Sequence, residues 1–150
     1  MAVSDARSSF EVLVQKDNFA VLKGLWRWSM CNNRKPRIIA LELLAGVSVQ
    51  ESVRTFLVKF EGVSKLIALL SNALPVDHRA VSAGGDEDGV DLLAVRYIVK
   101  AIVNICATNE SAKQAVRSKL NHVVIGSRQL QLHDIASRDE ALKFYLSMLN

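Results

Sequence analysis

An internal repeat constrains this chain more than any other feature of its sequence. Residues 39–52, IALELLAGVSVQES, align without gaps on residues 98–111, IVKAIVNICATNES, at a shift of 59 residues. An aperiodic stretch of about 17 residues lies between the two copies, and subtracting it leaves a period of about 42, which is typical of two- and three-helix solenoid repeats. The sequence therefore predicts helical units that stack on one another.

A second shift, of 44 residues, extends the repeat in both directions. It aligns apolar positions that recur at helical spacing in each segment: Val63, Leu66, Leu69 and Leu70 on Phe19, Leu22, Leu25 and Trp26, and Ile98, Ile102 and Ile105 on Leu142, Leu146 and Leu149. Three units then fill the chain, at about 8–47, 50–107 and 109–149. We expect one all-α domain over residues 1–150.

Composition and helix-start patterns agree with an all-helical chain. Half of the residues are hydrophobic and only two are prolines, which suits packed helices. Serine stands three residues before glutamate at three places, which is the pattern of a capping box: Ser8–Glu11, Ser48–Glu51 and Ser137–Glu140. Pro36 is expected in a first helical turn, and Thr108 or Asn109 is expected to cap the next helix after residue 107.

One segment interrupts the repeat. Residues 73–90 have no periodicity, contain Pro75 and three glycines, and carry the acidic run 86–88. Such a segment is too long for an ordinary helix–helix connection, so we interpret it as a surface insertion. Residues 123–132 predict a further, less regular helix. The net charge is +4, and because the insertion is acidic, the rest of the chain is strongly basic.

The best-patterned segments resemble the armadillo repeat family. Residues 62–71, GVSKLIALLS, resemble the second helix of that repeat, and residues 100–107, KAIVNICA, resemble its third helix. Residues 109–116, NESAKQAV, resemble the first helix of a following unit. The resemblance is good over about 50–119 and weaker outside that range. HEAT repeats and an unrelated helical bundle remain alternatives.

The resemblance implies a right-handed superhelical solenoid whose third helices line a concave groove. The groove residues would be Arg37 and Leu41 in the first unit and Arg96, Lys100 and Asn104 in the second. Lys100 stands where the family members that bind nuclear-import peptides have tryptophan, so that mode of binding is not expected. Asn104 could hydrogen-bond a ligand's backbone, or it could tie neighbouring helices together.

No arrangement of residues indicates an enzyme, a metal site or a cofactor. His78, His122 and His133 are scattered, and Gly84-Gly85 is followed by acids that would repel a phosphate group. Cys31 and Cys106 lie far apart on apolar faces, which indicates buried thiols in a reducing compartment. No apolar run is long enough to span a membrane. We expect a cytoplasmic protein, and a nuclear or mitochondrial location remains an alternative.

A basic surface offers an alternative function. Arg34 and Lys35 precede one helix, while Lys113 and Arg117 lie on another. If these residues aligned, they could contact nucleic acid or lipid headgroups in a nucleoprotein or organellar complex. Trp28 is the better candidate for an exposed anchor, because Trp26 fits the apolar face. In a third hypothesis, the acidic run 86–88 folds back on the groove as an internal competitor.

The last helix favours protein–protein interaction. Phe144, Tyr145 and Met148 make it apolar on more than one side, so something should cover it. The sequence therefore predicts a scaffold or adaptor that binds a protein partner, an extended peptide or a larger complex through its groove and this terminal helix. Self-association is a further possibility.

Overall fold

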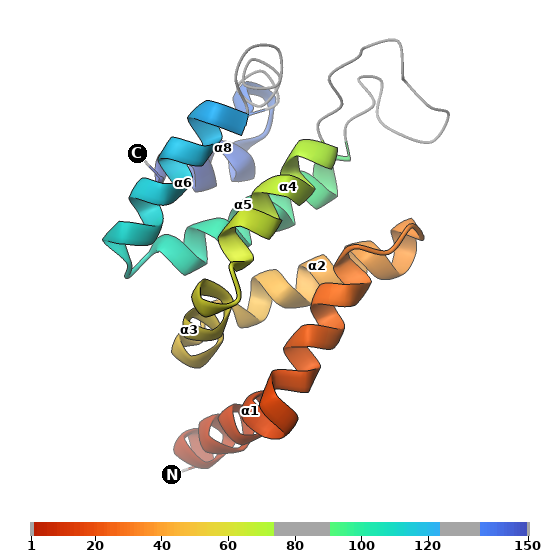
Figure 1. Cartoon of the computed structure of the whole chain (residues 1–150), viewed down its shortest axis with the longest axis vertical. Helices are drawn as coiled ribbons and strands as arrows, with labels where there is room; N and C mark the ends of the chain where they lie inside the picture. The colour runs from red at the N-terminus through yellow and green to blue at the C-terminus, as the bar shows by residue number, and fades with distance from the viewer. Residues whose placement is uncertain (1, 74–90, 124–135, 150) are drawn as a thin grey trace.

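The computed structural model describes residues 2–73, 91–123 and 136–149. All regular secondary structure within these ranges is helical, which confirms the all-α class. The elements are α1 (Ala2–Ser29), α2 (Arg34–Val47), α3 (Glu51–Lys59), α4 (Gly62–Ala73), α5 (Leu92–Cys106), α6 (Glu110–Val123) and α8 (Glu140–Ser147) (Figure 1). The acidic insertion beyond Ala73 lies outside the described residues, and so does the helix expected over 123–132 except for Val123, which ends α6.

Helix α1 consists of two helical segments separated by a break. Lys16 is extended, and Asp17, Asn18 and Phe19 all have positive φ values of 54°, 58° and 62°. These are left-handed conformations that side chains other than glycine rarely adopt. The two helical segments of α1 therefore meet at Asp17-Asn18 without continuous helical geometry. The capping box at Ser8 is wrong, because α1 already begins at Ala2 and good helix formers such as Ala2 and Ala6 continue it.

The capping box predicted at Ser48 is also wrong. Ser48 is buried and closes α2, since its Oγ donates to the carbonyl oxygen of Ala45 at 2.7 Å. The N-cap of α3 is Gln50, whose side chain makes no capping hydrogen bond. Pro36 does lie in the first turn of α2, where its missing N–H costs no hydrogen bond.

The starts of α6 and α8 use amide and carboxylate oxygens. Asn109 Oδ1 accepts from the N–H of Ala112 at 2.9 Å, as the sequence predicted. Helix α8 is capped by Asp139, which accepts from the N–H of Leu142 at 2.9 Å, and the capping box at Ser137 is wrong. The ionised carboxylate is a stronger acceptor than a hydroxyl, and Asp139 has an additional partner, described below.

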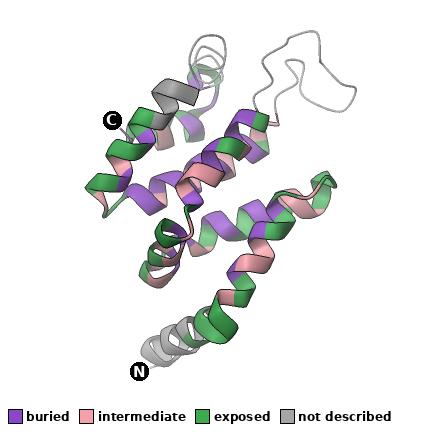
Figure 2. Cartoon of the chain, in the orientation of Figure 1, coloured by how far each residue is buried: buried purple, intermediate pink, exposed green. Residues whose placement is uncertain are grey.

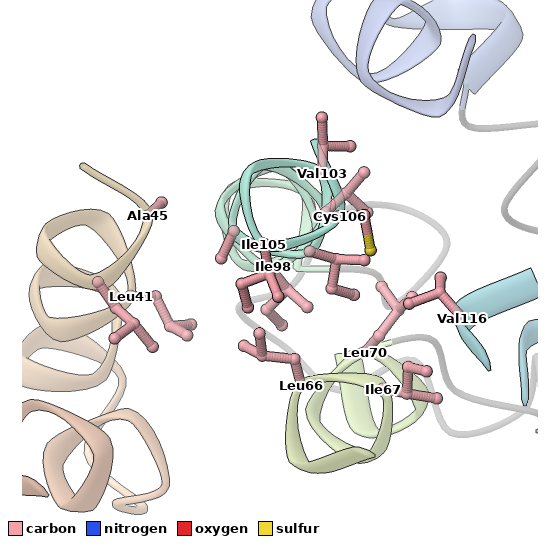
Figure 3. Close-up of a cluster of buried hydrophobic side chains, with 14 of the residues drawn as sticks. Leu41, Ala45, Leu66, Ile67, Leu70, Ile98, Val103, Ile105, Cys106 and Val116 are labelled. Atoms are coloured by element: carbon pink, nitrogen blue, oxygen red, sulfur yellow. The ribbon is translucent and has the colours of Figure 1, made fainter. Parts of the chain in front are cut away.

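Helix α5 is the centre of the fold. It contacts α2, α3, α4, α6 and α8, and most of its side chains are buried (Figure 2). Figure 3 shows Ile98 and Ile105 of α5 facing Leu41 of α2 and Leu66 of α4. One contiguous core results, and it joins α2 and α4 to the helices that follow residue 91.

Helices α2, α5 and α8 form a row, because α5 packs against both of the others. Hydrogen bonds join the start of α2 to the start of α5, through Arg34 and Asp91. They also join the ends, through Asn104 of α5 and Ala45 of α2. The two helices therefore run in the same direction. The superhelical solenoid and the number of repeats stay predictions.

Candidate interaction surfaces

The start of α2 is tied to the start of α5 by charged side chains. Arg34 donates from Nε and Nη2 to the two carboxylate oxygens of Asp91, at 3.0 and 3.1 Å. Arg37 Nη2 lies 3.8 Å from the same carboxylate, and its Nη1 donates to the carbonyl oxygen of Cys31 at 3.3 Å. Asp91 also caps α5 by accepting from the N–H of Ala94. Asp91 thus caps the start of α5 and also ties α5 to α2.

A similar arrangement joins the start of α5 to the start of α8. Arg96 of α5 donates from Nε to Asp139 at 2.8 Å and pairs with it through Nη2 as well. Asp139 is the N-cap of α8. The Arg96 hydrogen bond, opposed in part by burial, lowers the pKa of the Asp139 carboxyl, and the N–H of Leu142 acts in the same direction. In both junctions, α2–α5 and α5–α8, an arginine near the start of one helix pairs with the aspartate that caps the next helix of the row.

Asn104 ties the other ends of α2 and α5 together. Its Nδ2 donates to the carbonyl oxygen of Ala45 at 3.1 Å and to Ser48 Oγ at 3.0 Å. Ser48 is fully buried, so these hydrogen bonds satisfy polar atoms that water does not reach. The sequence allowed Asn104 either to bind a ligand or to tie neighbouring helices together. In the structure, its side chain ties α2 to α5.

The five predicted groove residues differ in burial and in the contacts that they make within the chain. Leu41 is only 2% exposed and packs in the core against α5, so almost none of its side chain is open to a ligand (Figure 3). Arg37, Arg96 and Asn104 are engaged within the chain. Lys100 is half-buried and, among the five, is the one for which the described part of the chain shows no hydrogen bond or ion pair.

The four basic residues do not form one patch. Arg34 and Lys35 lie at the start of α2, where Arg34 is paired with Asp91. Lys113 and Arg117 lie on α6, and Arg117 Nε donates to the carbonyl oxygen of Leu149 at 2.8 Å. Figure 1 places the α1–α2 turn and α6 on opposite sides of the molecule. The expectation of an aligned basic stripe is not met by these residues.

The terminal helix presents large apolar side chains to solvent. Phe144 is 61% exposed and Met148 is 47% exposed, while Tyr145 is half-buried and lies against the Phe144 ring. Leu142 on the same helix is fully buried toward α5. Phe144 lies two residues, or about 200°, around the helix from Leu142. The exposed pair thus occupies the outer face of α8.

A matching surface on α2 was not predicted. Ile39 is 54% exposed and Leu43 is 50% exposed, although both fall within an apolar helical pattern. They lie two residues before Leu41 and Ala45, which face α5, so they point away from the core. Periodicity alone could not separate the two faces, because α2 is apolar on both. Trp28 is exposed and Trp26 is buried, as expected.

One hollow lies where α1, α2, α4 and α5 meet. It has a volume of about 260 Å³, and its walls include Arg37, Leu41 and Asp91. Ala73 and Asp91, which flank the segment outside the described residues, also line it. Its polar side chains are Arg37 and Asp91 of the α2–α5 junction together with Ser29, Asn32 and Asn72.

Potential metal ligands do not gather in the part of the chain that the structure describes. Within the described ranges, no three His, Cys, Asp or Glu side chains are placed to hold a metal ion. Burial raises the pKa of the Cys106 thiol to about 11, with Lys113 acting in the opposite direction. Cys31 is only half-buried, because it lies in the turn after α1. His78 and His133 lie outside the described residues.

The chain is thus an all-helical protein with a central buried helix and two apolar outer faces. None of the helices that the structure describes is both long and apolar enough to cross a lipid bilayer. No family model, curated protein or solved structure matches the chain. The resemblance to armadillo repeats therefore rests on the residues of the chain itself.

Proposed function

We propose that this protein is a non-catalytic interaction scaffold that binds a protein partner through the outer face of α8. The exposure of Phe144 and Met148 is the observation that carries the proposal. Large apolar side chains grouped on one helix face are typical of protein–protein contacts, in which aromatic residues supply much of the binding energy. The proposal includes a cytoplasmic location and no cofactor.

The hydrogen bonds of the expected groove favour α8 over the groove as the contact surface. A ligand in the groove would compete with Asp139 for Arg96 and with Ala45 and Ser48 for Asn104. Replacing satisfied, partly buried hydrogen bonds gives little net gain. The outer face of α8 carries no such cost, because Phe144 and Met148 are exposed to water before binding.

We also propose an armadillo-like superhelix of about three units as the architecture. The repeated arginine–aspartate junction supports it. Arg37 and Arg96 are related by the same shift of 59 residues that defines the sequence repeat, and each forms an ion pair with the aspartate that caps the next helix of the row, Arg37 with Asp91 at 3.8 Å and Arg96 with Asp139. An irregular bundle gives no reason for that correspondence.

A photo-crosslinking amino acid placed at position 144 tests the proposed surface. In extracts of the native cells it should capture a discrete protein that mass spectrometry identifies. Placing the probe at Lys143 instead, also exposed and on the same helix, should reduce the yield of that adduct. A Met148→Glu substitution should reduce the adduct at position 144 by at least about tenfold, because a carboxylate would be buried in the contact.

The matched control is Ser147→Glu, which adds the same charge at a neighbouring exposed position. It should leave the adduct at position 144 unchanged. Equal yields from the Met148 and Ser147 variants would contradict an apolar contact. Adducts formed equally at all positions would show that α8 has no specific partner.

A further inference from the structure

The two apolar outer faces lie at opposite ends of the row formed by α2, α5 and α8. The outer face of α2 carries Ile39 and Leu43, and the outer face of α8 carries Phe144 and Met148. Each pair is spaced by four residues, so each forms a short stripe along its helix. The row therefore begins and ends with uncovered apolar side chains.

The interior of the row shows what such a face packs against. Between α2 and α5, the stripe of Leu41 and Ala45 lies against Ile98 and Ile105 (Figure 3). The shift of 59 residues places Ile39 of α2 at the position of Ile98 in α5. Ile98 is covered by the preceding helix of the row, whereas the described part of the chain places no helix over Ile39.

The C-terminal face completes the correspondence. At a shift of 44 residues, Phe144 and Met148 of α8 take the positions of Lys100 and Asn104 in α5. At a shift of 59, Lys100 and Asn104 in turn correspond to Leu41 and Ala45 of α2, the stripe that another helix covers. In α5, Asn104 instead reaches back to α2, so the comparison rests on α2 alone. The exposed pair of α8 takes the positions that pack on the next helix of the row in α2, and the outer face of α2 is the kind of face on which such a stripe packs.

The charges at the ends of the stripes are complementary. One turn before Ile39, on the same face of α2, is Lys35, and one turn before Phe144, on the same face of α8, is Glu140. Both side chains are exposed. Helices α2 and α5 are parallel, and a parallel arrangement of α8 on α2 would bring Glu140 and Lys35 to the same end of the contact.

From these observations we propose that the protein associates head to tail with itself. The outer face of α8 of one copy packs in parallel on the outer face of α2 of the next, and Glu140 of one copy lies near Lys35 of the other. This proposal rests on the proposed function, because it names a second copy of the chain as the partner of α8. Since the two faces differ, the contact is heterologous, and association can continue beyond a dimer.

Sedimentation velocity of the full chain over a range of concentrations tests the proposal. The mean mass of the wild-type protein should rise continuously with concentration and should not stop at that of a dimer. Phe144→Glu/Met148→Glu should weaken association at least about 100-fold, and so should Ile39→Glu/Leu43→Glu. Lys143→Glu/Ser147→Glu is the matched control and should associate as the wild type does.

Mixing the two apolar variants gives the most specific result. Each retains one intact face, so an equimolar mixture should form dimers and nothing larger. If the Ile39/Leu43 variant alone forms dimers, then α8 pairs with α8, and the head-to-tail contact is wrong. Circular dichroism of each variant establishes that the helices persist, which is expected because all four substituted residues are exposed.

Charge reversal tests the parallel register. Lys35→Glu should weaken association a few-fold, and adding Glu140→Lys should restore it, since exposed ion pairs contribute modestly. Failure of the second change to restore association would overturn the register. A wild-type protein that stays monomeric at every concentration would overturn self-association altogether. The proposed scaffold function would then still stand if the crosslinker at position 144 captured a different protein.

Discussion

Asn104 shows how a residue predicted for a groove can serve the core. The resemblance to armadillo repeats placed it on the third helix of a unit, where an amide could meet a ligand or a neighbouring helix. Its Nδ2 donates to Ala45 and Ser48, both on the preceding side of the row. The sequence predicted where Asn104 lies but not which groups it contacts. Its partner Ser48 was instead interpreted as the start of a helix.

Replacing Asn104 by alanine should destabilise the protein by about 1–2 kcal/mol, because the carbonyl of Ala45 and the buried Ser48 hydroxyl lose a donor. Urea unfolding followed by circular dichroism measures the change. Lys100→Ala, one turn earlier on the same helix, is the matched control and should change stability by less than about 0.5 kcal/mol. Equal effects of the two substitutions would contradict the structural role of Asn104.

The pair of Arg96 and Asp139 should make stability depend on pH. The pKa of Asp139 is lowered in the folded protein, whereas an unperturbed aspartate has a pKa of about 3.9. Its contribution is therefore fully present above pH 4 or so and is lost as the pH falls through the folded pKa. Asp139→Asn retains a capping oxygen but removes the charge.

At neutral pH, Asp139→Asn should cost about 1 kcal/mol, since Arg96 is partly exposed and solvent screens the pair. The difference from the wild type should shrink as the pH falls toward 3, and urea midpoints across a pH series measure it. Arg96→Gln should remove the same part of the pH dependence. A difference that stays constant from neutral pH to pH 3 would show that the charge of Asp139 contributes nothing.

At the scale of elements, apolar periodicity predicted where helices lie better than it predicted how they begin. The helices α4, α5 and α6 match the repeat-derived segments closely. Three starts were misassigned, at Ser8, Ser48 and Ser137, because a serine three residues before a glutamate is only a local pattern. At Ser137, a carboxylate two residues later has a partner 43 residues away, Arg96, which no local pattern reveals.

The junction between α3 and α4 depends on the absence of a side chain at Gly62. A Cβ atom there would lie 2.8 Å from the carbonyl oxygen of Leu57 and 3.2 Å from its Cβ, so the two helices would have to move apart. Gly62→Ala should therefore destabilise the protein by about 1–3 kcal/mol. Thermal unfolding measures the change.

Gly46 provides the opposite case on α2. Nothing lies within 4 Å of a Cβ built there, and alanine is the better helix former by about 0.5–1 kcal/mol. Gly46→Ala should accordingly raise the melting temperature. If Gly62→Ala raised it as well, the close contact between α3 and α4 would not exist in solution.

At the scale of the whole molecule, the sequence repeat predicted stacked helical units, and the row of α2, α5 and α8 is compatible with that prediction. The two outer faces were only half foreseen. The apolar character of α8 was evident from Phe144 and Met148, whereas apolar periodicity did not separate Ile39 and Leu43 from the buried positions of α2. Their exposure depends on what precedes α2 in space, and periodicity does not contain that information.

Salt distinguishes the apolar contact from a basic, phosphate-binding surface. A tenfold rise in sodium chloride should change the self-association constant by less than about tenfold, because the contact is mainly apolar and contains a single exposed ion pair. Binding through several lysines and arginines would instead weaken by orders of magnitude. Fluorescence anisotropy with a labelled oligonucleotide, measured in parallel, should show no tight complex at physiological salt.

The central position of α5 has a consequence for how the protein is made. The apolar stripes of α2 and α4 that α5 covers are synthesised first, and α5 follows from residue 92. At elongation rates of about 5–20 residues per second, the N-terminal half waits for seconds with Leu41 and Leu66 uncovered. Nascent chains stalled before residue 92 should therefore recruit chaperones on the ribosome, and chains stalled far enough beyond Cys106 for α5 to emerge should release them.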